Sequence, residues 1–145
     1  MKSKISATTS LYAFIASPAH HSKSPAMHNC AFKELNIDSV YLAFDIKSEE
    51  LETAVKGLKA LKVKGANVSM PHKQTIIPYL DNISTVSRLC NAVNTIKLED
   101  DKYYGTITDG VGFIKSLEEQ NWSIKNNKIT MVGAGGAATA IMVQM

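Results

Sequence analysis

The sequence predicts an α/β fold, a three-layer α/β/α domain around a mixed, mostly parallel sheet. Apolar runs that suit buried strands, such as residues 10–16 and 39–46, alternate with segments whose apolar residues have helical spacing. Strands that alternate with helices form a sheet covered on both faces. Pro, Gly, Ser and Asn separate these runs, as they do at turns. The chain of 145 residues is long enough to bury one hydrophobic core.

The first half of the chain predicts three strands and three helices. The strand at 10–16 leads through "SPAHHSKSP" to a helix with Ser24 as its N-cap and Pro25 as its first residue. After the strand at 39–46, Ser48 caps a second helix. One buried stripe on that helix is predicted by spacing alone: Leu51, Ala54, Val55, Leu58 and Leu61. The third strand, "GANVSM", stops at Pro71, which starts the next helix.

The second half predicts a hairpin and then a separate unit. "AVNTIKLEDDKYYGTITD" reads as two strands joined by a polar turn at 99–102, followed by a helix from about Gly110 to Gln120. The polar connector "NWSIKNN" precedes "KITMVGAGGAATAIMVQM", which predicts a strand, a glycine turn and a helix. We therefore expect one domain over residues 1–121 and the truncated start of a Rossmann-like domain over 122–145.

Composition excludes several classes of function. The net charge of +3 is small and the lysines are scattered, which argues against a nucleic-acid partner. No apolar run approaches the ~18–20 residues of a membrane span, so no membrane partner is expected. Cys30 and Cys90 lie in apolar contexts and predict reduced thiols in the core of a cytoplasmic protein. The four histidines match no zinc spacing, so we expect no metal site.

Several polar residues fall near the ends of predicted strands. Pro71 fixes Lys73 at the carboxyl end of a strand, which is where ligands bind in open α/β sheets. A lysine there is either a solvated surface charge or an acid/base. Ser24 serves equally as a helix cap, and turn or cap roles suit Asn94 and Asp109. If they converge, the candidate binding residues are Ser22, Ser24, Ser69, Lys73, Asn94 and Asp109.

The glycine turn "VGAGGAA" fits the pattern G-x-G-x-x-A between a strand and a helix, the context of a dinucleotide-binding turn. Its residues are Gly133, Ala134, Gly135, Gly136 and Ala137. A plain tight turn is the alternative. The residue that reads the ribose lies about 20 residues further on in such folds. The sequence therefore does not separate NADP from NAD, and as it stands the chain is expected to bind a dinucleotide poorly.

Five motifs occur in one order along nearly the whole chain: "SPAHHSKSP", "GANVSMPHK", "NAVNTI", "TDGVGF" and "VGAGGAA". In these motifs the sequence resembles the shikimate dehydrogenases. The resemblance implies an NADP-dependent enzyme, with NAD as the alternative cofactor, that reversibly reduces 3-dehydroshikimate to shikimate on the way to chorismate and the aromatic amino acids. It also implies a cytoplasmic monomer or homodimer.

The resemblance assigns a role to each candidate residue. Ser22 and Ser24 bind the substrate carboxylate, and Ser69, where the family usually has Thr, helps to hold the substrate. Asn94 and Asp109 bind ring hydroxyls. Lys73 is the catalytic acid/base, with Asp109 beside it, and the residues of the glycine turn, Gly133 to Ala137, bind the cofactor.

Three positions depart from the family pattern. Ala16 and Asn91 stand where the family usually has Gly, and Ile107 replaces the usual Asn of "NTDG". None of these changes removes a proposed catalytic group, but Ile107 is expected to reshape the pocket. The rival interpretations are a dehydrogenase that prefers quinate or another polyol acid, and a non-catalytic module that binds small carboxylic acids.

Two properties are expected of the isolated chain. Its cofactor unit is incomplete, so we expect no NADP-dependent turnover from it. Apolar residues in that unit are expected to be poorly covered, namely Met131, Val132, Ile141 and Val143.

Overall fold

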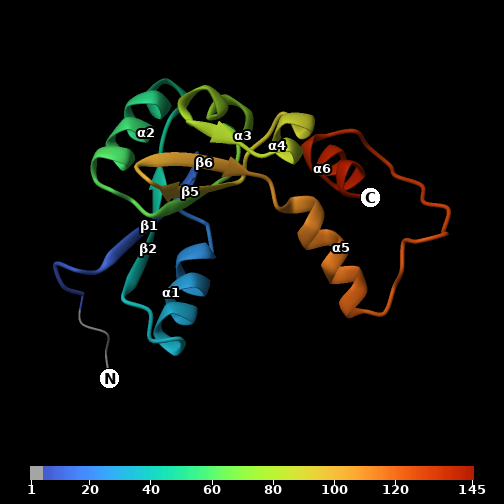
Figure 1. The fold of residues 1–145 in the computed structure, drawn as a ribbon, viewed down its shortest axis with the longest axis horizontal. Coiled ribbons are helices and arrows are strands. Elements are labelled where there is room, and N and C mark those ends of the chain that lie inside the picture. The colour runs from blue at the N-terminus through green and yellow to red at the C-terminus, as the bar shows by residue number, and fades with distance from the viewer. Residues whose placement is uncertain (1–4) are drawn as a thin grey trace.

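The computed structural model of the protein describes residues 5–145 (Figure 1). Within them, six strands form one sheet in the order β2-β1-β3-β5-β6-β4. β1 pairs in parallel with β2 and β3, and β4 pairs in parallel with β6, whereas β5 runs antiparallel to β3 and β6. The predicted α/β fold with a mixed sheet is confirmed. The strands are β1 (Ser10–Ala16), β2 (Ser39–Asp45), β3 (Gly65–Val68), β4 (Asn82–Ile83), β5 (Thr95–Glu99) and β6 (Lys102–Thr106).

Helices cover both faces of the sheet. In Figure 1, α1 (Ser24–Glu34) lies below the sheet, while α2 (Leu51–Ala60) and the short α3 (His72–Thr75) lie above it. Past the end of β6, α5 (Asp109–Glu119) and α6 (Gly136–Gln144) pack on each other, and α6 also contacts α4 (Thr85–Cys90). Two 3₁₀ turns complete the order, η1 (Ser48–Glu50) before α2 and η2 (Ile77–Tyr79) after α3.

The main core lies between the sheet and α2. Buried side chains of β1 and β3, among them Ile15 and Val68, pack with Leu51, Val55 and Leu58 of α2. These three leucine and valine positions confirm most of the predicted stripe, and the half-buried Ala54 packs beside them. Leu61 is the exception. It is 73 % exposed because α2 ends at Ala60, so Leu61 stands after the last turn.

Three predicted helix starts are wrong in detail. Lys23 is the N-cap of α1, and Ser24 is its first residue without a side-chain cap bond. Instead, the Ser22 hydroxyl accepts the Ser24 N–H at 3.2 Å. The two serines therefore form a turn just before α1. Ser48 opens the 3₁₀ turn η1 and caps no helix. Pro71 is the N-cap of α3 and not its first residue.

The predicted strand before the glycine turn is also wrong. Residues 128–135 are not in a strand, and α6 begins at Gly136. A strand exists through its hydrogen bonds to a neighbour, and among the described residues no strand lies beside this segment. The helix after the glycine turn is confirmed, as are the hairpin of β5 and β6 and the helix that follows it.

Two expectations from composition meet the structure here. Cys30 is exposed and Cys90 is buried, and both are free thiols within residues 5–145, so only Cys90 belongs to a core. None of the helices in the described part of the chain has the length and hydropathy needed to span a bilayer.

Candidate active site

The topology of the sheet brings four predicted site residues together at one end of the strands β3, β5 and β6. β5 runs antiparallel to β3, so its first residue, Thr95, pairs with Asn67 near the end of β3. Thr95 also pairs with Thr106 at the end of β6. Consequently Ser69 and Lys73, which follow β3, lie near Asn94, which precedes β5, and near Asp109, which follows β6.

Lys73 and Asp109 form an ion pair at these strand ends. The Lys73 ammonium donates to Asp109 Oδ2 at 2.7 Å, and the two side chains are 31 % and 30 % exposed. Asp109 is the first residue of α5, where the helix dipole favours a carboxylate. Lys73 is thus a half-buried, paired lysine and not a solvated surface charge.

The backbone around Lys73 is anchored on both sides. The Lys73 carbonyl accepts the Val93 N–H at 2.7 Å, and the Ser69 carbonyl accepts the His72 N–H at 2.9 Å. His72 is fully buried, and its Nε2 lies 2.6 Å from the Ile46 carbonyl oxygen. These contacts connect the start of α3 to the residues after β2 and before β5, so the Lys73 side chain starts from a fixed position.

Asn94 holds the other oxygen of Asp109. Its Nδ2 donates to Asp109 Oδ1 at 2.6 Å, while its Oδ1 accepts the Thr108 N–H at 3.1 Å. The Thr108 hydroxyl lies 3.0 Å from Asn94 Nδ2 and 3.2 Å from its Oδ1. Thr108 was not predicted as a site residue. Its position next to Asp109 in "TITD" is the signal that would have found it.

Ser69, Lys73 and Asp109 border a cavity of about 450 Å³, whereas Asn94 and Thr108 are not among its lining residues. Ile107, which is 4 % exposed, forms part of its apolar wall. Gly136 and Ala137, at the start of α6, reach the same cavity, so some of the predicted cofactor residues lie beside some of the predicted substrate residues. The lining residues are Ser69, Met70, Pro71, Lys73, Gln74, Ala92, Ile107, Asp109, Gly136 and Ala137.

Ser22 and Ser24 lie apart from this lining. They belong to the loop after β1 and the start of α1, and both are half-buried. The loop approaches the cavity through its first residue, because the Ser17 N–H donates to the Met70 carbonyl at 3.1 Å. Asp45 holds the same loop by accepting the Ser17 hydroxyl at 2.8 Å and the Ala19 N–H at 3.0 Å.

The glycine turn is open to its surroundings. Gly133 has φ of 110°, a left-handed conformation that favours glycine. A Cβ atom added at Gly133, Gly135 or Gly136 would meet nothing within 4 Å, so a ligand can approach this backbone closely. Only Gly136 and Ala137 of the turn line the cavity, whereas Gly133, Ala134 and Gly135 are exposed beyond it. No group of three or more metal-ligating side chains occurs in residues 5–145.

With this geometry in place, the similarity to known proteins decides the family. Residues 14–96 match the family described as the shikimate dehydrogenase substrate binding domain. The chain belongs to this family. It is 50 % identical over 147 aligned residues to the shikimate dehydrogenase (NADP(+)) of Streptococcus uberis, covering 100 % of this chain and 50 % of that protein. The chain therefore spans about half the length of the curated relatives it matches.

Solved structures of shikimate dehydrogenases have the same fold. A Listeria monocytogenes shikimate 5-dehydrogenase in complex with shikimate and NAD is 46 % identical, with a TM-score of 0.95 over 99 % of this chain and 50 % of that one. A shikimate dehydrogenase in complex with NADP⁺ is 45 % identical, with a TM-score of 0.93 over 97 % of this chain and 49 % of that one. The predicted family resemblance is confirmed.

Proposed function

We propose that the chain is the substrate-binding part of an NADP-dependent shikimate dehydrogenase, which reversibly reduces 3-dehydroshikimate to shikimate. Residues 1–121 would form the substrate-binding domain, and 122–145 the start of the cofactor-binding domain. The observation that carries the proposal is the Lys73–Asp109 pair, 2.7 Å apart at the edge of a cavity that Ser69 and Gly136 also line. The family match and the relatives' names support the same activity.

The proposed chemistry gives each side chain one task. The hydroxyls of Ser22 and Ser24 hold the substrate carboxylate by hydrogen bonds, and Asn94 holds ring hydroxyls. In the direction of reduction, Lys73 Nζ donates its proton to the carbonyl oxygen of the substrate. In the direction of oxidation the neutral amine takes the hydroxyl proton back. Asp109 accepts a hydrogen bond from the ammonium and so orients Nζ.

The residues present fit one part of the cofactor. The backbone of Gly133, Gly135 and Gly136 has the open space that a pyrophosphate needs for close approach. When bound, the nicotinamide supplies or accepts the hydride. Gly136 and Ala137 line the same cavity as Lys73, which would bring the proton and hydride partners to one place. NADP is the proposed cofactor and NAD the alternative.

Titration of the ¹⁵N-labelled chain with shikimate tests this proposal. We expect saturable shift changes at Ser69, Lys73, Asn94 and Asp109, and in the loop with Ser22 and Ser24. The double substitution Ser22→Ala/Ser24→Ala should weaken binding by about 0.5–1.5 kcal/mol per neutral hydrogen bond, and by up to ~3 kcal/mol for a charged one. Shift changes that avoid these residues, or none at all, would contradict the proposal.

Ile107 favours a second candidate, a dehydrogenase for quinate or another polyol acid. Its buried side chain lines the cavity where the family usually has a polar Asn. A parallel titration with quinate separates the two candidates: tighter binding of quinate than of shikimate would favour the second. Shikimate binding without NADP-dependent turnover in a chain of the relatives' full length would favour a non-catalytic binding module.

A further inference from the structure

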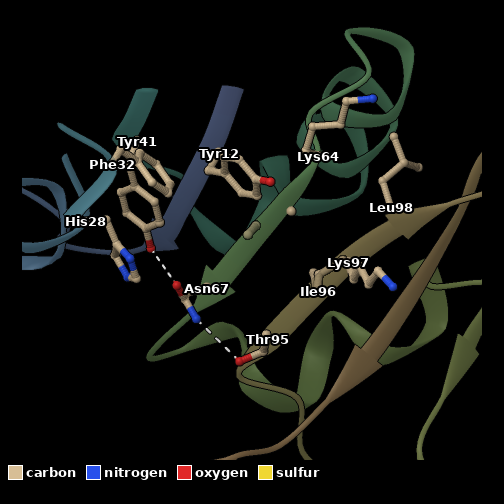
Figure 2. Close-up of a pocket in the computed structure, with 12 residues that line it drawn as sticks. Tyr12, His28, Phe32, Tyr41, Lys64, Asn67, Thr95, Ile96, Lys97 and Leu98 are labelled. Carbon is tan, nitrogen blue, oxygen red and sulfur yellow. Dashed lines mark hydrogen bonds between the residues drawn. The ribbon is translucent and has the colours of Figure 1, made fainter. Parts of the chain in front are cut away.

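A second set of polar side chains lies behind the site, on the sheet face that α1 partly covers. Figure 2 shows Tyr41 of β2, Asn67 of β3 and Thr95 of β5 in one row, in which the Tyr41 side chain reaches across β1, the strand between β2 and β3. The Tyr41 hydroxyl donates to Asn67 Oδ1 at 2.8 Å, and Asn67 Nδ2 donates to Thr95 Oγ1 at 3.3 Å. The Thr95 hydroxyl donates in turn to Asn94 Oδ1 at 2.8 Å.

This row continues into the active site in one direction. Asn94 Nδ2 donates to Asp109 Oδ1 at 2.6 Å, and Lys73 Nζ donates to Asp109 Oδ2. Each amide uses its carbonyl as an acceptor on the Tyr41 side and its NH₂ as a donor on the Asp109 side. Every donor in this row of hydrogen bonds therefore points toward the Asp109 carboxylate. Hydrogen bonds aligned in this way polarise and strengthen one another.

The orientation of Asn94 is favoured by this arrangement together with the Thr108 N–H, which also donates to Asn94 Oδ1. An amide turned over by half a rotation would place its NH₂ against the Thr95 hydroxyl and the Thr108 N–H, and its oxygen against the Asp109 carboxylate. The Thr95 proton, given to Asn94 Oδ1, favours the orientation that reaches Asp109. Because Asn67 Nδ2 is only a donor, Thr95 Oγ1 accepts from it and keeps its own proton for Asn94.

Tyr41, at the end of the hydrogen-bonded row farthest from Asp109, is held firmly by its surroundings. Tyr41 is 2 % exposed, and the His28 ring stacks on it with ring centroids 4.3 Å apart. Burial raises the pKa of Tyr41 to about 12, so its hydroxyl stays a donor at every ordinary pH. Asn67 and Thr95 are half-buried and line a groove of about 460 Å³ beside Tyr41.

We infer that Thr95, Asn67 and Tyr41 are positioning residues, which hold the Asn94 amide and through it the Asp109–Lys73 pair in the geometry needed for shikimate; the inference rests on the proposed function. Thr95 is the decisive member because its hydroxyl donates to the Asn94 side chain, whereas Asn67 Nδ2 reaches only the Asn94 backbone carbonyl, at 3.4 Å. Its loss should matter most, and the loss of the Tyr41 hydroxyl less.

The first test needs no substrate. In the ¹⁵N-labelled chain, Thr95→Val removes the hydroxyl and keeps the shape and strand preference of the side chain. We expect the side-chain NH₂ of Asn94 to exchange with solvent roughly three- to tenfold faster, the factor that one neutral hydrogen bond is worth. Tyr41→Phe should give a smaller change in the same direction. Thr95→Ser, which keeps the hydroxyl, should restore the slow exchange.

Thr106→Val is the matched control. Thr106 pairs with Thr95 in the sheet, but its hydroxyl bonds to Ser84, 3.0 Å away, and not to Asn94. Thr106→Val should leave the exchange rate of the Asn94 side-chain NH₂ unchanged. Equal effects of Thr95→Val and Thr106→Val would overturn the inference, since any lost threonine would then act alike. Thermal unfolding of each variant shows whether the fold is kept, and Tyr41→Phe carries the test if Thr95→Val unfolds.

The second test uses shikimate binding as a double-mutant cycle. Thr95→Val alone should weaken binding roughly three- to tenfold, and Thr95→Val in an Asn94→Ala background should weaken it no further, because coupled residues are not additive. Additive losses would overturn the positioning role. If the unsubstituted chain does not bind shikimate, the proposed function fails, while the exchange of the Asn94 NH₂ still decides whether the hydrogen-bond chain exists.

Discussion

The ion pair at the candidate active site has a geometry that suits proton transfer. Lys73 is held at its backbone by Val93 and at its ammonium by Asp109, which leaves about a third of its side chain open toward the cavity. An exposed lysine on α2, Lys56, gives a useful contrast. It pairs with Glu52 one turn away, and its side chain is 74 % exposed. Surface pairs of that kind contribute about 0–1 kcal/mol.

The first prediction is the loss of chemistry on substitution of Lys73. In a chain of the relatives' full length, Lys73→Ala should lower kcat by about 10²–10⁴, the usual share of general acid–base catalysis. Shikimate affinity should fall much less, because its carboxylate is bound elsewhere. Lys73→Arg keeps the charge but does not release a proton near neutral pH, so it should be nearly as inactive. Steady-state kcat and KM measure both effects.

Lys56→Ala is the control for this prediction. It should leave kcat unchanged and alter the free energy of unfolding by less than about 0.5 kcal/mol. A near-normal kcat in Lys73→Arg would show that the position requires only a positive charge, and the acid/base would then have to be another residue.

Asp45 is a second residue with a clear electrostatic signature. The Ala19 N–H and the Ser17 hydroxyl, in that order, donate to its carboxylate and lower its pKa. A lowered folded pKa means that the ionised form stabilises the fold. This contribution is complete above the unfolded pKa of about 3.9 and is lost as the pH falls through the lower folded value. The loop that carries Ser22 should therefore loosen in acid.

The second prediction concerns this loop. Asp45→Ala removes both acceptor oxygens, so the hydrogen bonds from Ser17 and Ala19 are lost at every pH. We expect faster hydrogen exchange of the Ala19 amide, and no further loosening of the loop as the pH falls below about 4. Asp38→Ala is the control, since Asp38 stands before β2 and accepts from Thr8 and Thr9 instead. Equal exchange at Ala19 in wild type and Asp45→Ala would refute the anchoring role.

At the scale of elements, α5 and α6 approach each other through a glycine. A Cβ atom added at Gly110 would lie 2.2 Å from the Ala140 carbonyl oxygen and 2.8 Å from the Gln144 Cβ. Ala140 is 1 % exposed and packs in a small cluster with Cys90 and Ile107. Because Ile107 also lines the active-site cavity, the seating of α6 bears on the shape of the site.

The third prediction compares two glycines on one helix. Gly110→Ala should cost about 1–3 kcal/mol through overpacking, or release α6 from α5. Hydrogen exchange of the α6 amides distinguishes these outcomes. At Gly112 an added Cβ meets nothing within 4 Å, so Gly112→Ala should raise the helix stability by about 0.5–1 kcal/mol. Similar effects at the two positions would contradict the close packing at Gly110.

Elements with a strong local pattern were predictable, and the others depended on partners. The β5–β6 hairpin follows from its alternating residues and its polar turn, and α2 follows from its apolar stripe. Both patterns lie within short stretches of sequence. β4 has two residues, and its pairing with β6 leaves no local signal. α4 was not predicted either, although Ser84 caps it by accepting the Ser87 N–H. Residues 128–132 have a strand's composition but no neighbouring strand in the described chain.

At the scale of the whole molecule, the site is assembled by topology from residues far apart in the sequence. The sequence predicted that Lys73, Asn94 and Asp109 lie near strand ends, and their convergence is seen in the hydrogen bonds that join them. It did not predict Thr108, nor the chain through Thr95 to Tyr41. Those contacts depend on which face of the sheet each side chain occupies and on the rotamer it adopts, and neither follows from local spacing.

The chain also presents an apolar surface around α5 and α6. Phe113, Leu117 and Ile141 line a groove of about 530 Å³ with Trp122 and Ile129. Of the four residues predicted to be poorly covered, Val132 is 97 % and Val143 37 % exposed, whereas Met131 and Ile141 are half-buried. An exposed apolar patch of this kind favours association.

The fourth prediction is that the 145-residue chain self-associates through this surface as its concentration rises. Sedimentation velocity over a range of concentrations should show a weight-average sedimentation coefficient that increases with concentration. Val132→Asp should reduce the increase, because a carboxylate is costly to bury in an apolar contact. Leu61→Asp is the control, since Leu61 is 73 % exposed at the end of α2, outside the groove. A chain that stays monomeric at every concentration, or that associates equally in Val132→Asp, would show that this surface does not drive association.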